Sequence, residues 1–416
     1  MLTYLATVRA FSRDARLLLA TQALASISYI GIYLVLFNLY LVRLGYDTGF
    51  IGWINGVSFL CFALFSLPAG MIGARRGVRW AAVVGLLVAG IGLVLTPLTE
   101  FIPTVWQAHW LVITYILAWL GAALYTVNFI PFLVGVTDAE TRNHVFAFAA
   151  AGVPAGAFVG SLLGGLLPGW FAGLLAIAPD SVVVYRDSLL VGALLFLLTA
   201  PLLFLTRPLA QETQKNTEEE AAPAPYGFMA LMALVIVLRL ASESAGKAFF
   251  TVYLDTSLHV PTTSIGAIVA VGQLLAIPAA LFTPILLSRW GRPRTIQVSL
   301  LGITICLLPL ALIPQWSVAT LAYMALMVFS LIAQPALNVY TQEMTPKRWR
   351  ATMAGAVTMA GGIGQAVMSM GGGYLIAGVG YGAFYWLGAL LGAFSALFFA
   401  GYLYRSARRT RGSVFA

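Results

Sequence analysis

Charged side chains are scarce in this chain. Only 9% of its 416 residues are Asp, Glu, Lys or Arg, whereas a soluble globular protein has about 25%. Hydrophobic residues make up 61% of the chain, and the mean hydropathy is +0.93. This scarcity excludes an ordinary soluble domain, because so few charged groups do not suit a surface exposed to water.

Residues and motifs that bind cofactors or carry out catalysis are also sparse. The two cysteines, Cys61 and Cys306, lie within apolar runs and are expected to act as small hydrophobic side chains. The three histidines have no second ligand at metal spacing, and the sequence contains no phosphate-binding loop or nucleophile elbow. We therefore predict neither an enzyme nor a metal or cofactor site, so that any uphill activity must draw on an ion gradient.

Long apolar runs dominate the sequence instead. Segments of about 20 residues, long enough to cross a membrane as helices, recur from end to end. The short alternating strands of membrane barrels do not occur. We predict an all-α membrane protein with twelve spans near residues 15–42, 49–69, 78–98, 105–133, 143–167, 187–206, 227–254, 264–287, 294–313, 317–341, 349–377 and 382–404.

A polar segment divides these spans into two sets of six. Residues 207–226, "RPLAQETQKNTEEEAAPAPY", are acidic and rich in proline and alanine. Such a segment cannot bury enough apolar surface to fold. We predict a cytoplasmic linker between an N-terminal bundle (1–206) and a C-terminal bundle (227–416).

The positions of Lys and Arg predict how the protein lies in the membrane. All but four of the 23 lie on the side of both termini, the exceptions being Arg43, Arg186, Arg239 and Lys247. Because cytoplasmic loops retain basic residues, we expect both termini in the cytoplasm and the protein in a plasma membrane, the inner membrane of a prokaryote. The net charge of +9 then reflects topology and contact with membrane lipids, and it does not indicate nucleic-acid binding.

The two halves of the chain repeat each other. "YLVRLGYDTGFIG" (40–52) resembles "YLDTSLHVPTTSIG" (253–266), and "GARRGVR" (73–79) resembles "LSRWGRPR" (287–294). An offset of 208 residues pairs Thr137 and Arg142 with Thr345 and Arg350, and it pairs a run of small residues in the fifth and eleventh spans. Such repetition is typical of transporters built from two related bundles.

With these features the chain resembles the major facilitator superfamily over essentially its full length. The family's loop pattern Gly-x-x-x-Asp-Arg-x-Gly-Arg-Arg is matched in "GMIGARRGVR". The resemblance implies gating-loop roles for Gly70, Arg75, Gly77, Arg79, Arg289 and Gly291. The acid of this pattern, which latches helices in the family, is replaced by Ala74 in the first half and by Ser288 in the second. A conventional latch is therefore not expected.

The fifth span carries a second resemblance. The family's proton-driven exporters have a Gly-x-x-x-Gly-Pro-x-x-Gly-Gly pattern there, and "GAFVGSLLGG" (156–165) supplies Gly156, Gly160, Gly164 and Gly165, with Ser161 in place of the proline. The match implies export of the drug/proton antiporter type. Glycines four residues apart also let any two membrane helices approach closely, so that a purely packing role stays open.

Three charged residues occupy one face of the seventh span. Arg239, Glu243 and Lys247 are spaced four apart, which places them about 6 Å from one another along one helical face. Charges at this depth are costly and are functional by default. Glu243 is the one carboxylate well inside a span, so we predict that it couples transport to protons, with Arg239 and Lys247 binding substrate. A permanent bridge between helices is the alternative.

The resemblance also implies which other residues line a cavity, because helices 1, 4, 7 and 10 surround the central cavity in that family. Packing between helices and interfacial aromatic belts are the competing interpretations for such residues. The predicted substrate-binding positions on these helices are Tyr29, Tyr33, Asn38, Tyr115, Trp119, Asn128, Gln334 and Asn338.

We therefore predict a monomeric secondary transporter that moves a small molecule by alternating access. Proton-coupled export of an amphipathic compound is the preferred version. Uptake of an organic anion, bound by Arg239 and Lys247, is the alternative. A lipid flippase or a membrane sensor that no longer transports also stays open, because one fold serves many functions.

Overall fold

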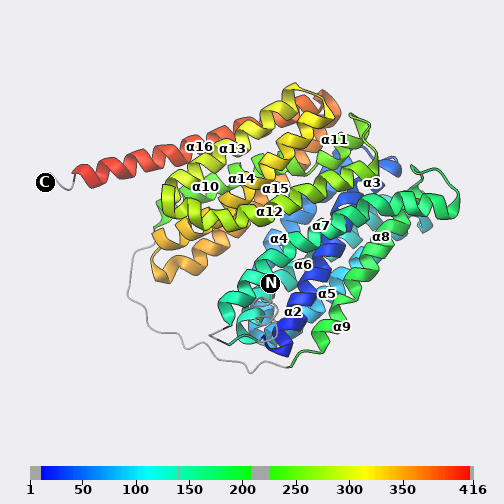
Figure 1. Cartoon of the computed structure of the whole chain (residues 1–416), viewed down its shortest axis with the longest axis horizontal. Helices are drawn as coiled ribbons and strands as arrows, with labels where there is room; N and C mark the ends of the chain where they lie inside the picture. Colours follow the sequence, from blue (N-terminus) through cyan, green and yellow to red (C-terminus); the bar gives the residue numbers. More distant parts are fainter. Residues whose placement is uncertain (1–10, 139–140, 208–224, 413–416) are drawn as a thin grey trace. The chain divides into compact units, whose positions relative to one another are not determined.

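A computed structural model describes residues 11–138, 141–207 and 225–412, and within these ranges the chain forms helices and no β-strand (Figure 1). The linker predicted at 207–226 lies almost wholly outside the described residues. The helices are α2 (Arg13–Ala25), η1 (Ser26–Tyr33), α3 (Leu34–Arg43), α4 (Thr48–Arg76), α5 (Val78–Leu95), η2 (Thr96–Phe101), α6 (Thr104–Gly135), α7 (Arg142–Leu175), α8 (Val182–Leu197), α9 (Thr199–Phe204), α10 (Tyr226–Lys247), α11 (Phe250–Thr256), α12 (Thr262–Trp290), α13 (Arg292–Leu312), α14 (Trp316–Met344), η3 (Lys347–Trp349), α15 (Arg350–Val379) and α16 (Tyr381–Gly412).

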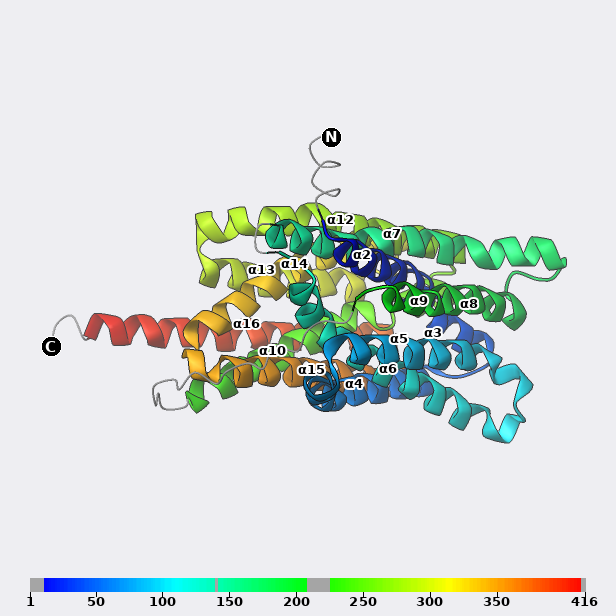
Figure 2. The ribbon, with the colours of Figure 1, turned by 90° about the horizontal axis from the view of Figure 1, so that it is seen from below.

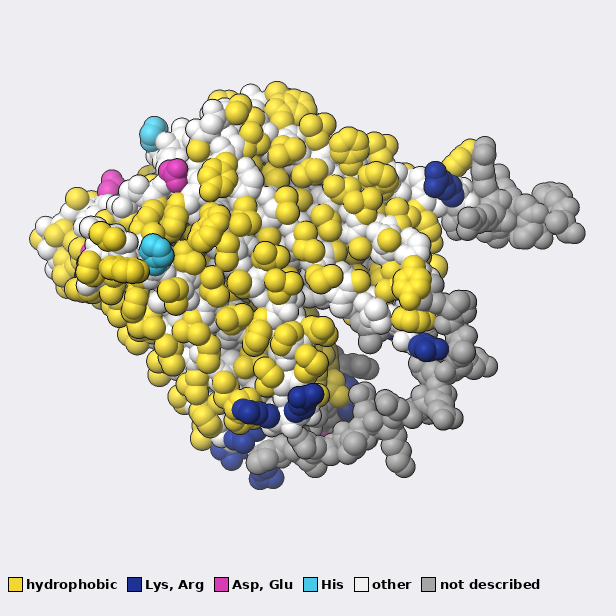
Figure 3. All heavy atoms as spheres, turned by 180° about the vertical axis from the view of Figure 1, so that it is seen from behind, with side chains coloured by type: hydrophobic (Ala, Val, Ile, Leu, Met, Phe, Trp, Pro, Cys, Tyr) yellow, Lys and Arg dark blue, Asp and Glu magenta, His cyan; other side chains and the backbone are white. Residues whose placement is uncertain are grey.

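Each predicted span corresponds to a helix or to a run of helices. Eleven of these segments in the described part of the chain are long and apolar enough to cross a membrane. The remaining segment, α15, has 30 residues and is rich in glycine and alanine, which contribute little hydropathy. Hydrophobic side chains cover most of the face in Figure 3, and the Lys and Arg side chains lie at its margins.

The chain divides into two compact units that each contain a segment from the other half of the sequence. The first unit comprises Met1–Asp47, Cys61–Gln214 and His259–Leu274, so it includes the first part of α12. The second comprises Thr48–Leu60, Lys215–Leu258 and Leu275–Ala416, so it includes the first part of α4. The predicted division into residues 1–206 and 227–416 stays a prediction.

Glycines bring helices together in the first unit. On α7, an added Cβ at Gly156 or Gly160 would collide with the backbone of the first span, and one at Gly164 would press against Ile32. Gly165 faces α12 instead, where its Cα lies against Gly266. The fifth-span glycines therefore act in close helix packing, the use that their spacing predicts.

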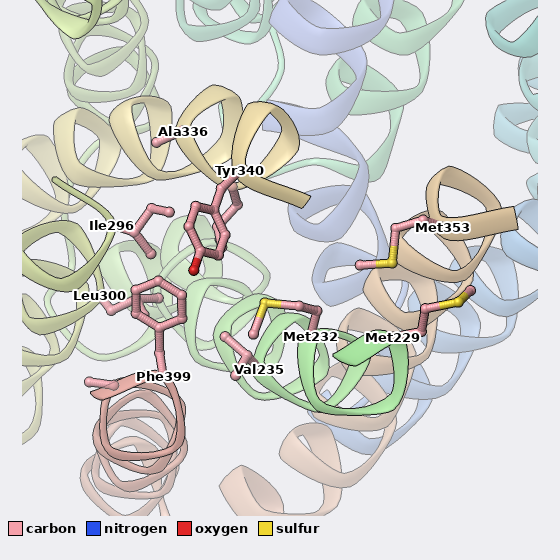
Figure 4. Packing of buried hydrophobic residues seen from close by; sticks show 11 residues of the cluster. Met229, Met232, Val235, Ile296, Leu300, Ala336, Tyr340, Met353 and Phe399 are labelled. Carbon is pink, nitrogen blue, oxygen red and sulfur yellow. The ribbon is translucent and has the colours of Figure 1, made fainter. Parts of the chain in front are cut away.

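The second unit repeats these contacts. Gly364 of α15 packs against the backbone of α10, and Gly373 packs against Gly52 of α4. α10 and α15 lie side by side in both ribbon views (Figure 2). Figure 4 shows one apolar core of this unit, formed by Met229, Met232, Val235, Ile296, Leu300, Ala336, Leu337, Tyr340, Met353, Ala396 and Phe399.

Two further pairs of positions confirm the internal repeat. Gly77 and Gly291 each precede the third helix of their half, and both have positive φ angles, 93° and 74°. Glycine alone adopts such angles without strain. Arg142 donates to the carbonyl oxygen of Thr137 at 3.2 Å, and Arg350 donates to that of Thr345 at 3.3 Å.

Candidate functional site

The charged face of α10 forms a linked triad. Glu243 lies 3.2 Å from Arg239 (Oε2 to Nη1) and 2.6 Å from Lys247 (Oε1 to Nζ). The exposed side-chain fractions rise along the helix, from 2% for Arg239 through 13% for Glu243 to 33% for Lys247. The spacing of four therefore produces both ion pairs, and the triad becomes more accessible toward the end of α10.

α14 supplies a polar partner to this triad. Nη2 of Arg239 donates to Oε1 of Gln334, and Nε2 of Gln334 donates to Oδ1 of Asn338 at 3.3 Å. Gln334 and Asn338 are both exposed. The Nη1 atom of Arg239 faces only Glu243, and its Nε makes no hydrogen bond within the described residues. Three predicted binding residues are thus brought together, of which Arg239 is buried and Gln334 and Asn338 are exposed.

The seventh span is interrupted directly after the triad. α10 ends at Lys247 and α11 begins at Phe250. Phe249, in the break, is buried and packs edge-on against Phe384 at 5.4 Å, and Phe250 stacks on Tyr323 at 4.1 Å. These ring contacts pack the break against α16 and α14. Discontinuous membrane helices are a recurring element of transporter binding sites.

A cluster of aromatic side chains occupies the first unit, and it brings together four of the predicted residues. Tyr29 contacts Tyr33 and Trp119 at centroid distances of 6.3 and 6.0 Å. Tyr115 lies 6.2 Å from Trp119 and stacks on Phe37 at 4.1 Å. The hydroxyl of Tyr33 donates to the carbonyl oxygen of Leu93 at 3.3 Å, whereas the buried hydroxyls of Tyr29 and Tyr115 make no well-formed hydrogen bond in the described chain.

Three members of this aromatic cluster were not predicted. Phe37 follows Tyr33 at the helical spacing of four, so its place on the same face is readable from the sequence. Phe62 and Phe196 lie 5.7 Å from Trp119 and 6.3 Å from Tyr29 respectively. No local signal points to them, because they come from α4 and α8.

The two predicted asparagines of the first unit are both buried. Asn38 lies in α3. The amide nitrogen of Asn128 donates to the carbonyl oxygens of Ala69 at 3.1 Å and Leu124 at 2.8 Å, and its side chain fills the space beside Gly73. The structure therefore places Asn128 in the contact between α4 and α6.

The predicted gating loops differ in their contacts. Arg79 donates to the hydroxyl of Thr206 at 3.1 Å and to the carbonyl oxygen of Phe204 at 2.8 Å, which ties the start of α5 to the end of α9. Arg75 and Arg289 are exposed. The hydroxyl of Ser288, which replaces the family's acid, donates to the carbonyl oxygen of Ile285 within its own helix at 2.9 Å. Gly70 lies beside Val127.

The basic residues predicted on the opposite side are both paired with acids. Arg43 lies 3.2 Å from Asp180. Arg186 lies 2.8 Å from Asp187 and 3.5 Å from Glu100. Elsewhere in the described part of the chain, no three His, Cys, Asp or Glu side chains gather in a way that could hold a metal ion.

The family model "Major Facilitator Superfamily" matches residues 18–369, with a second match over 232–415. The chain belongs to the major facilitator superfamily. Its membership confirms the all-α membrane fold of twelve spans and identifies a transporter rather than an enzyme. No sequence among curated proteins matches the chain.

Solved structures of this superfamily resemble the chain over nearly its full length. A crystal structure of a D-xylose–proton symporter aligns with a TM-score of 0.73 at 15% identity, covering 92% of this chain and 96% of that one. A point mutant of the nucleoside transporter NupG aligns at 0.72 and 14%, covering 92% and 99%. A bacterial homolog of the human lysosomal transporter Spinster aligns at 0.69 and 16%, covering 92% and 95%. At these identities the likeness shows the fold alone.

Proposed function

We propose that this protein is a proton-coupled transporter of a small organic anion and that the Arg239–Glu243–Lys247 triad binds both the anion and the proton. One observation supports the proposal most strongly. Glu243 lies within ion-pair distance of two cations on α10, so the triad carries one net positive charge when all three groups are ionised. A negatively charged substrate is the natural complement of such a site.

The burial of Arg239 supports the same proposal. A buried charge without full compensation is costly, so it is retained where it serves a function. Arg239 donates to Gln334 and its Nη1 faces Glu243 at 3.2 Å, while its Nε makes no hydrogen bond in the described structure. A planar guanidinium group binds carboxylate or phosphate groups with two parallel hydrogen bonds. The exposed amides of Gln334 and Asn338 offer further polar contacts to such a ligand.

The triad also offers a way to couple anion and proton. Arg239 and Lys247 both lie within ion-pair distance of Glu243, and nearby positive charges favour the ionised form of a carboxylate. An anion that engages these cations removes part of this stabilisation, and a desolvated carboxylate then favours its neutral, protonated form. Anion and proton binding would therefore reinforce each other, which is the thermodynamic requirement for symport.

The second candidate is proton-coupled export of an amphipathic compound. The aromatic cluster of the first unit favours it, because Tyr29, Tyr115 and Trp119 offer ring faces together with polar groups. The glycine pattern of α7 supports it further. In this version Glu243 exchanges a proton for a cationic substrate, so the two candidates differ in the sign of the substrate's charge.

The orientation and the cellular setting belong to the same proposal. The excess of Lys and Arg on one side supports cytoplasmic termini in a plasma membrane. We propose that the protein works there as a monomer whose partners are its substrate, protons and the surrounding lipids.

Transport by purified protein in lipid vesicles tests the proposal. Glu243→Gln should reduce accumulation driven by a pH gradient to the level of empty vesicles, while exchange of labelled substrate across the membrane persists. Glu343→Gln is the matched control, since Glu343 is 40% exposed and pairs with Arg292 at the end of α14. Unchanged pH-driven accumulation in Glu243→Gln would show that Glu243 does not bind the coupled proton.

The sign of the substrate's charge is tested separately. In a thermal-shift screen of organic anions and lipophilic cations, a ligand at 100 times its dissociation constant stabilises the protein by about 2.7 kcal/mol. The proposal expects stabilisation by an anion, and loss of that effect in Arg239→Gln. Stabilisation by cations that survives Arg239→Gln would favour the exporter instead.

A further inference from the structure

A groove of about 790 Å³ lies at one end of the second unit, where α10 begins and α14 and α16 reach the ends of their apolar spans. Its lining includes Phe228, Leu231, Leu397, Phe398, Gly401 and Arg405. The volume falls within the range of about 300–1,000 Å³ typical of small-molecule sites. The groove is separate from the triad, because none of its lining residues belongs to the triad or to its partners on α14.

The groove is apolar, and its inner wall is firmly packed. Phe228, Leu231 and Tyr402 pack against the core of Figure 4. On the open side, a Cβ added at Gly401 would meet no atom within 4 Å. From Arg405 to Leu397 the helix advances by about 12 Å at 1.5 Å per residue. The groove thus runs from the polar end of α16 into the depth of the span.

A positive charge lies at the end of the groove that is nearest the end of the α16 span. Arg405 is exposed and has no hydrogen-bond or ion-pair partner among the described residues. Glu343, next to the lining residue Met344, is paired with Arg292 at 2.7 Å, so its charge is already compensated. Exposed Tyr226 and Tyr404 lie at the same span ends, as is usual for aromatic residues at a membrane surface.

We propose that this groove binds one anionic phospholipid, with an acyl chain along Leu397 and Phe398 and the phosphate group at Arg405. The charge of Arg405 complements an anionic headgroup, and the apolar walls complement a chain. Basic pockets between membrane helices bind such headgroups on the cytoplasmic side, and the distribution of Lys and Arg predicts that this end of the protein faces the cytoplasm.

Native mass spectrometry of the full-length protein in detergent tests the proposal with phosphatidylglycerol and phosphatidylcholine. Phosphatidylglycerol should bind more tightly than phosphatidylcholine. Arg405→Gln should weaken phosphatidylglycerol binding about five-fold, the effect of one basic residue at a membrane surface, and should leave phosphatidylcholine unchanged. Gly401→Leu, which fills the groove, should weaken both lipids. Glycerol 1-phosphate, which has no acyl chain, should not compete.

Two matched variants separate this site from general effects. Arg16→Gln removes another exposed basic residue on the same predicted side, and Gly169→Leu adds a side chain at another open glycine; neither should change lipid binding. Equal losses in Arg16→Gln and Arg405→Gln would overturn the proposal in favour of diffuse attraction. Competition by glycerol 1-phosphate would point to a soluble anion. Lipid binding that Gly401→Leu leaves intact would show that the lipid binds outside this groove and would overturn the proposal.

Discussion

Asn128 and Asn338 are two amides with different surroundings, and they should respond differently to the same substitution. Asn128 is buried and bonds to the carbonyl oxygens of Ala69 and Leu124, whereas Asn338 is exposed. A hydrogen bond between membrane helices contributes about 1–2 kcal/mol. Asn128→Ala should therefore lower the midpoint of thermal unfolding in detergent, while Asn338→Ala should leave it unchanged.

Ligand binding supplies the other half of this test. If Asn338 contacts substrate, Asn338→Ala should weaken the stabilisation given by a bound ligand, and Asn128→Ala should preserve it in the protein that stays folded. A loss of ligand binding in Asn128→Ala at unchanged stability would instead show that Asn128 contacts the substrate.

The contacts of a side chain were predictable from the sequence where its partner lies on the same helix. The spacing of Arg239, Glu243 and Lys247 alone indicates two ion pairs, and both form. The partner of Arg239 on α14 was not predictable, since Gln334 lies 95 positions away. Which carbonyl oxygens Asn128 bonds to likewise depends on how α4 and α6 pack, and helical spacing carries no information about that.

Among the helices, α7 offers the sharpest comparison, because two of its glycines have opposite surroundings. A Cβ at Gly160 would collide with the backbone of Ile27 and Gly31, while one at Gly169 would meet nothing within 4 Å. Gly160→Ala should cost about 1–3 kcal/mol through overpacking. Gly169→Ala should be neutral or stabilise by up to about 1 kcal/mol, because alanine favours the helix.

Unfolding midpoints of the two variants, measured in one detergent, check this prediction. The two substitutions are chemically identical and lie in the same helix, so helix propensity cancels between them. Equal midpoints would show that the first span and α7 do not depend on close backbone contact, and the packing role of the fifth-span glycines would be wrong.

Helices were predicted with their ends within a few residues in most cases, because apolar length and loop charges mark them. Irregularities inside the helices were not predicted. Ser26–Tyr33 forms a π-helix, and the seventh span breaks between Lys247 and Phe250. Both depend on hydrogen-bond registers that packing selects, so residue composition does not reveal them. α7 also continues to Leu175, eight residues beyond the predicted end.

The π-helix of the first half and the charged segment of the second half occupy equivalent places in the repeat. With Tyr40 aligned to Tyr253, the π-helical segment that carries Tyr29 and Tyr33 corresponds to the segment that carries Arg239 and Glu243. Gly156 and Gly364 pack against these two segments from α7 and α15. The repeat therefore preserves the packing frame while the side chains diverge, into an aromatic cluster in one unit and a charged triad in the other.

The exchange of segments between the sequence halves predicts how the molecule behaves when its linker is cut. The first unit contains His259–Leu274 from the second half, and the second contains Thr48–Leu60 from the first. Gly266 packs on Gly165, and Gly52 packs on Gly373. After cleavage at a protease site inserted in residues 208–224, a tag on the C-terminus should still recover both halves in mild detergent.

Two variants check that the glycine contacts are responsible. Gly266→Leu should reduce that recovery, since its side chain would collide with the backbone of α7, whereas Gly169→Leu should not. Separation of the unmutated halves on cleavage would show that these glycine contacts are too weak to hold the exchanged segments in place.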